Sequence, residues 1–508
     1  RIKGVLLTEE GELIADGSHQ WENRLENGIW TYSMEAVWKG MQECYGDLKT
    51  KVREAYGAEI ETIGGIGISA MMHGYLAFDG NDELLVPFRT WRNTITEQAS
   101  RELTEDFHYP IPQRWSIAHL YQAVLNGEAH VKDIKYITTL AGYVHWMLTG
   151  ERVLGVDDAS GMFPVDAKTG NYYTDMLDCF DQKISDRSFP WKIREILPRP
   201  LLAGEQAGVL TEEGAGLLDQ EGTLKAGIPL CPPEGDAGTG MVATNSVKVR
   251  TGNVSAGTSI FSMIVLEKEL SNVYSEIDLV ATPQGAPAAM VHCNNCTSDL
   301  NAWVNILKEF SDTFGFHISG DELYGGLFRK ALEGDKDCGG LVAYNYVSGE
   351  PVAGFAEGRP LFVRRQDGRF NLANFIRTHL YAAFGTLKIG NDLLFDKEGV
   401  KVDVIWGHGG IFKTEGTAQK ILAAVLNTPV SVMKSAGEGG AWGIAVLALY
   451  MINKKEGEAL EDYLEKRIFQ KAESVTAAPE PEDIEGFNQF MENYKKGLMI
   501  EKAAVDAL

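Results

Sequence analysis

An aspartate among small residues is the most informative feature of the sequence. Asp236 lies in the segment Gly227–Met241, GIPLCPPEGDAGTGM, where an apolar strand ends in two prolines and a helix-like segment opens. Small neighbours leave room for a substrate, and an ionised carboxylate there can accept a proton from an attacking hydroxyl. The structural alternative is that Asp236 caps the helix that follows. Taken alone, the pattern favours the cap.

A second group of residues is suited to phosphate and to a nucleotide. The turn Gly257-Thr258-Ser259 follows a strand and offers backbone N–H groups and two hydroxyls to phosphate oxygens. Gly407–Gly410 and Gly437–Ala441 each stand where a strand or loop meets a helix, and glycine there would let a flat base approach the backbone. An ordinary hairpin turn and close helix packing are the alternatives. The sequence contains neither a Walker A loop nor a Rossmann GxGxxG motif opening a βαβ unit, which disfavours P-loop kinases and dehydrogenases.

Several side chains could recognise a polyol. Met72 and His73 come directly after a predicted buried strand, and a histidine there can hydrogen-bond a sugar hydroxyl. Trp91 and Arg92 could line the same site. The alternatives are a structural histidine and a solvated arginine.

These residues need strands and helices that alternate along the chain. The periodicity predicts a helix from Met34 to Val52, with Ser33 as its N-cap, and then a strand at Ile66–Ser69. Further elements are predicted as strands at Val247–Val249, Val254–Val265, Val402–Trp406 and Pro429–Met433, and as helices at Tyr136–Leu148, Leu300–Phe310, Leu372–Phe395, Ala418–Leu426, Gly440–Ile452 and 484–498. This order indicates an α/β fold. We expect two domains, 1–244 and 245–508, with a cleft between them.

Composition narrows the class of function. The 508 residues include 47 Lys and Arg against 71 Asp and Glu, a net charge of −24, which disfavours nucleic-acid and membrane partners. No apolar run approaches the roughly 20 residues that a membrane span needs. Six cysteines make no disulfide framework, and a reducing cytoplasm fits best.

Taken together and in order, these segments resemble the FGGY carbohydrate kinases of the actin-like ATPase superfamily, and among them the xylulokinases. The resemblance spans residues 2 to about 450 and includes the Met-His-Gly form of the substrate loop. Its segments are IGISAMMHGYLAFD (66–79), DDASGMFPVD (157–166), GDAGTGM (235–241), SAGTS (255–259), YNYVSGEPVAGFAEGRP (344–360), GHGGIFKTEGTAQKILAAVLNTPV (407–430) and GEGGAWGIAVLA (437–448).

The resemblance implies a fold of two actin-like, ribonuclease H-like domains around a central cleft, with mixed sheets flanked by helices. The N-terminal domain would bind the sugar and carry the catalytic Asp, and the C-terminal domain would bind the nucleotide. Asp236 would deprotonate a sugar hydroxyl for attack on the γ-phosphate of ATP, and would contact Mg²⁺ through water. Met72, His73, Trp91 and Arg92 would contact the sugar. Phosphate would lie at Gly257, Thr258 and Ser259, and adenosine near Gly409, Gly410, Lys413, Glu438 and Gly439.

The resemblance leaves the sugar open. A ketopentose such as xylulose is the first expectation, and ribulose, rhamnulose, fuculose, gluconate and polyols are alternatives. The segment Trp91-Arg92-Asn93-Thr94-Ile95 lacks the Asp and Arg of the family pattern, and the family's first phosphate hairpin would precede Arg1. A non-catalytic sugar sensor and an actin- or chaperone-like ATPase are the other readings. Family members are often dimers, so a homodimer is a further option.

Overall fold

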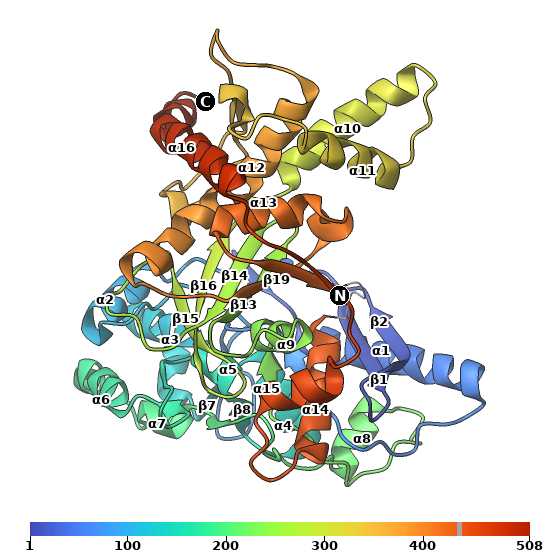
Figure 1. The fold of residues 1–508 in the computed structure, drawn as a ribbon. Coiled ribbons are helices and arrows are strands. Elements are labelled where there is room, and N and C mark those ends of the chain that lie inside the picture. The colour runs from blue at the N-terminus through green and yellow to red at the C-terminus, as the bar shows by residue number, and fades with distance from the viewer. Residues whose placement is uncertain (434–438) are drawn as a thin grey trace. The chain divides into compact units, whose positions relative to one another are not determined.

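The chain is an α/β protein in the computed structural model, which describes residues 1–433 and 439–508 (Figure 1). Its residues form two compact units. Unit 1 comprises Arg1–Val247, Asp278–Ala288 and the described part of Gly437–Lys471. Unit 2 comprises Lys248–Ile277, the described part of Ala289–Ala436, and Ala472–Leu508. The chain therefore returns twice to unit 1 after leaving it, whereas the sequence predicts two continuous domains.

Unit 1 contains eleven of the described helices and several short strand pairs. Its helices are α1 (Met34–Tyr56), α2 (Glu97–Phe107), α3 (Ser116–Leu125), α4 (Leu140–Thr149), α5 (Val156–Ser160), α6 (Thr174–Lys183), α7 (Ile193–Ile196), α8 (Glu212–Leu218), α9 (Asp236–Ala243), α14 (Gly440–Asn453) and α15 (Leu460–Tyr463). Its strands are β1 (Ile2–Leu7), β2 (Leu13–His19), β3 (Arg24–Glu26), β4 (Ile29–Thr31), β5 (Ser69–Ala70), β6 (Leu76–Phe78), β7 (Tyr136–Thr138), β8 (Val153–Gly155), β9 (Val165–Asp166), β10 (Asn171–Tyr172), β11 (Arg199–Leu201), β12 (Glu234–Gly235) and β15 (Asp278–Ala281).

The strand pairs of unit 1 determine which residues meet at the candidate site. β12 runs parallel to β5, with Glu234 opposite Ser69 and Gly235 opposite Ala70. β11 runs parallel to β8. Because parallel neighbours end at the same edge, the residues that follow β5 and β12 lie side by side. This places Met72 next to Asp236.

Helix α1 begins and ends as the sequence predicts. The Ser33 side chain accepts a hydrogen bond from the Ala36 amide, and Gly57 ends the helix in the left-handed region with φ 62°. Its apolar face includes Val37, Leu48 and Val52, which belong to a core cluster that also contains Leu76 and Phe78. The helix therefore packs against the interior of unit 1.

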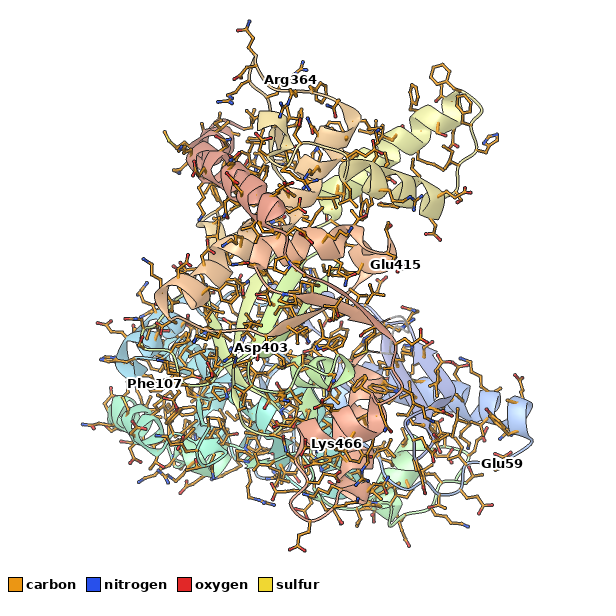
Figure 2. The ribbon with its side chains drawn as sticks, in the orientation of Figure 1. Glu59, Phe107, Arg364, Asp403, Glu415 and Lys466 are labelled. Carbon is orange, nitrogen blue, oxygen red and sulfur yellow. The ribbon has the colours of Figure 1, made fainter. Side chains whose placement is uncertain are left out.

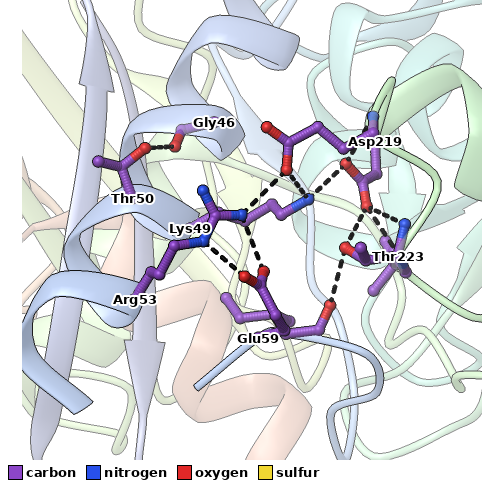
Figure 3. A network of polar contacts seen from close by, with 10 residues as sticks. Gly46, Lys49, Thr50, Arg53, Glu59, Asp219 and Thr223 are labelled. Carbon is purple, nitrogen blue, oxygen red and sulfur yellow. Dashed lines mark hydrogen bonds and ion pairs between the residues drawn. The ribbon is translucent and has the colours of Figure 1, made fainter. Parts of the chain in front are cut away.

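A polar network ties α1 to the turn after α8 (Figure 3). Lys49 Nζ lies 2.8 Å from Asp219 Oδ1, and both side chains are only 3% exposed. Burial alone would raise the pKa of Asp219, but hydrogen bonds from Lys49, Leu224 and Thr223 outweigh it and lower the pKa to about 2. Arg53, one turn further along α1, instead pairs with exposed Glu59. The network thus has a buried pair and an exposed pair on one helix.

Unit 2 is organised around one mixed sheet. Its helices are α10 (Ser298–Thr313), α11 (Gly320–Ala331), α12 (Leu372–Asp392), α13 (Thr417–Leu426) and α16 (Pro481–Ala507). Its strands are β13 (Thr251–Ala256), β14 (Ile260–Val265), β16 (Pro287–Cys293), β17 (Val342–Tyr344), β18 (Leu361–Val363), β19 (Val404–His408), β20 (Val430–Met433) and β21 (Ser474–Ala477). Among the strands of unit 2, the order in this sheet is β16, β14, β13, β19, β20 and β21.

The helices of unit 2 bury its apolar residues. α12 has Leu380, Phe384 and Leu387 completely buried, as expected for a helix inside a core. α16 contributes Phe487, Phe490 and Tyr494, also completely buried. Charged side chains such as Glu59 of unit 1 and Arg364 of unit 2 lie exposed on their own units (Figure 2).

Two predicted elements were wrong, and the predicted strand Ile66–Ser69 overlaps β5 only at Ser69, since β5 comprises Ser69–Ala70. Tyr136–Leu148 is not one helix, because Tyr136–Thr138 forms β7 against β6, and α4 starts only at Leu140 with Thr139 as its N-cap. The β-branched Ile137 and Thr138 suit a strand. Val247–Val249 is not a strand, since β13 starts at Thr251. Within the described residues, no helix is both long and apolar enough to cross a bilayer.

Candidate active site

Asp236 is the first residue of helix α9 and follows strand β12 directly. Asp236 is an exposed residue, and its Oδ1 accepts a hydrogen bond of 3.3 Å from the Met72 amide. Desolvation raises the pKa of Asp236, and hydrogen bonds from the amides of Met72 and Ala237 oppose this shift. The side chain is therefore both reachable and more basic than an aspartate in water, as a general base requires.

Met72 and His73 lie beside Asp236. His73 has a left-handed backbone (φ 67°), and its Nδ1 is 3.0 Å from the Gly161 carbonyl oxygen. Burial lowers the pKa of His73 to about 3, so the ring is neutral. A neutral ring that donates from Nδ1 to a carbonyl keeps Nε2 as an acceptor. His73 can thus accept a hydrogen bond from a hydroxyl.

Three further carboxyl groups lie buried in unit 1 near Asp236. Asp157, Asp158 and Glu234 are each at most 1% exposed. Burial raises the pKa of all three, and the charge of Asp236 raises that of Asp157 further. Glu234 Oε2 accepts a hydrogen bond from the Asp158 amide, and Thr139 donates one to Asp158 Oδ2 at 2.6 Å. All three groups are thus part of the buried polar interior of unit 1.

Trp115 and Arg114 are two further residues of unit 1 in this region, and Trp115 contacts His73. Trp115 is completely buried, and its ring stacks on that of His73 with centroids 6.1 Å apart. Its indole Nε1 has no hydrogen-bond partner among the described residues. Arg114 forms an ion pair with Asp278, and burial lowers its pKa to about 10. Neither residue stands out in the sequence as a site residue, because each depends on a tertiary contact.

The structure places Trp91 and Arg92 on an exposed segment of unit 1. Tyr75 and Arg89 form an antiparallel bridge, so the chain passes close to Gly74 before it reaches residue 91. Trp91 is 42% exposed, and the Arg92 guanidinium lies 4.2 Å from the centre of the Trp30 ring. Asn93 fixes the segment through hydrogen bonds with the Trp30 backbone. A sugar contact by Trp91 or Arg92 stays a prediction.

Asp236 also borders a cavity of about 770 Å³ inside unit 1. Much of its lining is apolar and comes from β1, α1, residues 63–71 and α14. A polyhydroxylated sugar needs polar partners, which this lining supplies at few places. Ser69 and Asp236 are two polar members of the lining, and they mark the part of the cavity suited to a hydroxyl group.

Within unit 2, the structure brings the predicted phosphate-binding turn and the glycine cluster Gly407–Gly410 together. The turn Gly257-Thr258-Ser259 joins β13 to β14, and its first two residues are exposed. β19 runs parallel to β13 with His408 opposite Ser255. Gly409 follows with φ 109°, and a Cβ there would lie 2.1 Å from the Ala256 carbonyl oxygen. Only glycine permits this approach beside the turn.

The amides and charges of this region are only partly available to a ligand. The Gly257 amide donates to the Ser259 carbonyl at 2.9 Å, so the turn offers hydroxyl groups and its remaining backbone. Gly410 has open space around a built Cβ, and the exposed Lys413 ends the short helix Gly410–Lys413. These residues could accommodate an anionic group.

The described residues of the other glycine cluster, 439–441, belong to unit 1. Gly439 is the N-cap of α14, with φ 64°, and Glu438 lies outside the described residues. A Cβ at Gly443 would lie 2.0 Å from the Thr239 carbonyl oxygen, so α14 packs closely on α9. Gly440, within the cluster, faces the same helix, because its built Cβ would lie 3.0 Å from Thr239 Oγ1. Close helix packing, the alternative interpretation, therefore accounts for Gly440. An adenosine contact by Gly439 or Glu438 stays a prediction.

Family models match both halves of the sequence. Residues 1–242 match the N-terminal domain of the FGGY family of carbohydrate kinases, and residues 252–452 match its C-terminal domain. The chain belongs to the FGGY family of carbohydrate kinases. It is therefore a phosphotransferase that acts on a sugar or related carbohydrate, and its expected kinase activity is confirmed at that level.

Individual FGGY relatives agree on the fold. The chain is 23% identical over 440 residues to a xylulose kinase of Haemophilus influenzae, covering 85% of this chain and 83% of the relative. It superposes on a xylulose kinase structure from Brucella ovis with a TM-score of 0.77 and 19% identity, over 99% of this chain and 97% of the other. A gluconate kinase structure from Lactobacillus acidophilus gives 0.77 and 18% identity, over 97% and 94%. The predicted two-domain, actin-like α/β fold is thus confirmed.

One carboxyl group of this FGGY kinase fits the binding of a magnesium nucleotide. No group of three or more metal-ligating side chains occurs among the residues that the structure describes. Mg²⁺ is usually held by one or two carboxylates together with phosphates and water, and the exposed Asp236 carboxylate fits that pattern. Asp236 could hold a hydrated Mg²⁺, which would neutralise charge on the phosphates.

Proposed function

We propose that this FGGY kinase transfers the γ-phosphoryl group of ATP to a hydroxyl of a ketopentose, with xylulose as the first candidate. The best support for the chemistry is Asp236, an exposed residue whose carboxyl pKa is raised by desolvation. The xylulose kinases among the similar proteins favour that sugar, and the gluconate kinase keeps sugar acids as the alternative.

In the proposed reaction, the sugar hydroxyl proton passes to a carboxylate oxygen of Asp236. The hydroxyl oxygen forms a bond to the γ-phosphorus as the bond from that phosphorus to the leaving oxygen of ADP breaks. His73 Nε2 accepts a hydrogen bond from a second sugar hydroxyl and orients the sugar. Water would compete as the acceptor, so ATP without sugar is expected to turn over slowly.

The remaining assignments are proposals of the same kind. Thr258 and Ser259 would bind phosphate oxygens, and Gly409, Gly410 and Lys413 would lie near the nucleotide. Mg²⁺ is proposed as the metal and Asp236 as its contact through water. A cytoplasmic location and a homodimer stay predictions.

The test is ADP release in a coupled assay over ketoses, aldoses, polyols and sugar acids, with Asp236→Asn as the matched variant. We expect xylulose to raise turnover by orders of magnitude, and Asp236→Asn to lower kcat about 10²- to 10⁴-fold, because it removes the base. The variant should keep its thermal stability. If another sugar alone stimulates turnover, the kinase assignment stands and xylulose is wrong. If no sugar stimulates turnover but one protects the protein against unfolding, a sugar sensor replaces the kinase.

A further inference from the structure

Helix α9 carries Asp236 but has no capping side chain of its own. Its N-cap is Gly235, which offers no oxygen to the amides of the first turn. Such amides need an acceptor when protein encloses them, because unpaired buried N–H groups are costly. The acceptor comes from another helix: Asp157, in the first turn of α5.

One oxygen of Asp157 serves two amides. Oδ2 accepts hydrogen bonds from the Gly235 amide at 3.1 Å and from the Gly238 amide at 3.2 Å. These residues lie on either side of Asp236 in the chain. The carboxyl group therefore holds the turn that determines where the Asp236 side chain points.

The two glycines are what allow this carboxyl so close to the helix. A Cβ at Gly238 would lie 2.4 Å from Asp157 Cγ, and a Cβ at Gly235 would lie 2.2 Å from Met72 Cγ and 2.9 Å from Asp157 Oδ2. Contacts this short do not occur, so any side chain would push α9 and Asp157 apart. Gly238 thus permits the approach of Asp157, and Gly235 permits the approach of both Met72 and Asp157.

Asp157 is itself held firmly and does not face a substrate. Its side chain is completely buried, unlike that of Asp236. Ser160 Oγ donates to the Asp157 carbonyl at 2.5 Å and accepts from the Ala281 amide at 2.9 Å, which anchors α5 to β15. A buried, anchored acceptor suits a role in positioning.

We propose that Asp157 is a positioning residue that holds the first turn of α9 through two amides and thereby fixes the Asp236 carboxylate for proton transfer. The role rests on the proposed function of Asp236 as the base. It needs an oxygen acceptor at this place, and an asparagine side chain can supply one. Misplacing a catalytic group by about 1 Å can cost about 10²-fold in rate.

The test compares Asp157→Ala, Asp157→Asn and Asp158→Ala in the full chain. Asp158 is the matched control, because it is equally buried on the same helix but its carboxyl bonds to Thr139. We expect Asp157→Ala to lower kcat about 10²-fold with an unchanged KM for ATP. Asp157→Asn should restore kcat to within a few-fold of the wild type, and Asp158→Ala should reduce stability with little loss of kcat.

Hydrogen exchange of residues 234–241, read by mass spectrometry, gives a measurement that does not depend on activity. Asp157→Ala should raise exchange there and Asp158→Ala should not. If Asp157→Ala does not fold, Gly238→Ala replaces it, because its Cβ separates the amide from Asp157. Equal kcat and equal exchange in the two alanine variants would overturn the proposal. A different outcome is that Asp157→Ala raises exchange while the wild-type protein phosphorylates no sugar. That result would support the role of Asp157 in holding the first turn of α9 and would contradict the proposed function instead.

Discussion

The candidate residues of unit 1 are side chains supported by buried polar groups, whereas those of unit 2 are hydroxyls and backbone at an exposed turn. Asp236 and His73 have pKa values that burial shifts, and Asp157 holds the helix from behind. In unit 2, Gly409 brings β19 against β13 beside Gly257-Thr258-Ser259. A group that must exchange a proton benefits from a tuned pKa, while a group that binds a phosphate mainly needs an accessible backbone and hydroxyls.

This difference predicts where substitutions should act. Unit 1 should be sensitive to the loss of partners for buried charges, and its site variants should change kcat or the KM for the sugar. Unit 2 should be sensitive to added side-chain atoms at glycines, and its site variants should change the KM for ATP.

Lys49→Met tests the dependence of unit 1 on buried charge partners and has the largest expected effect on stability. Removing Lys49 leaves Asp219 buried without its cation, and breaking a buried ion pair costs about 3–5 kcal/mol of the free energy of unfolding. Denaturant unfolding measures the loss. Arg53→Met on the same helix is the control, because its pairs are exposed and should contribute little. Equal losses in the two variants would contradict the importance of burial.

Gly409→Ala tests the dependence of unit 2 on glycine. The new Cβ would meet the Ala256 carbonyl oxygen, and φ 109° disfavours any side chain, so we expect a loss of about 1–3 kcal/mol in the free energy of unfolding. The displaced turn should also raise the KM for ATP and leave the KM for the sugar unchanged.

The stability control for this glycine is Gly410→Ala, because no heavy atom lies within 4 Å of a Cβ built there. Thermal unfolding of both variants and initial rates at varied ATP separate the two effects. A Gly409→Ala protein as stable as Gly410→Ala would show that the strands can move apart without cost.

The sequence predicts the local features of this site better than it predicts the buried residues that hold the site in place. Asp236 at the start of a helix after a strand, and the turn Gly257-Thr258-Ser259 between two strands, follow from glycine, proline and β-branched residues close by in the chain. Asp157 could not be assigned a role, because its partners, Gly235 and Gly238, are some 80 residues away in sequence. Only the fold brings them together.

The errors have the same origin. Tyr136–Leu148 has helical periodicity, but pairing with β6 turns its first residues into a strand. Gly437–Ala441 and Gly407–Gly410 look alike as sequence, yet the packing of α14 on α9 explains Gly440, while contact between β19 and β13 explains Gly409. Tertiary contacts thus decide what each glycine does.

A substitution of His73 has the smallest expected effect on stability. It tests whether burial of a site residue in unit 1 shifts its pKa. Its pKa in the folded chain is about 3, below the value of about 6.5 expected when unfolded. Above pH 6.5 the ring is neutral in both states and costs nothing. As the pH falls from about 6.5 toward 3, the unfolded chain binds a proton that the folded chain does not, so His73 lowers stability by up to about 1.4 kcal/mol per pH unit.

His73→Gln should remove that contribution. Between pH 7.5 and 5.5 its free energy of unfolding, from denaturant titrations, should fall by about 1 kcal/mol less than that of the wild type. His145 is a useful control, because burial lowers its pKa to about 4, it bonds to the Ala207 carbonyl, and it does not line the cavity that Asp236 borders. His145→Gln should reduce the pH dependence in the same way and leave the KM for sugar unchanged, whereas His73→Gln should raise it. If His73→Gln changes neither the pH dependence of stability nor the KM for sugar, the prediction is wrong: the ring is then not buried and does not bind the sugar.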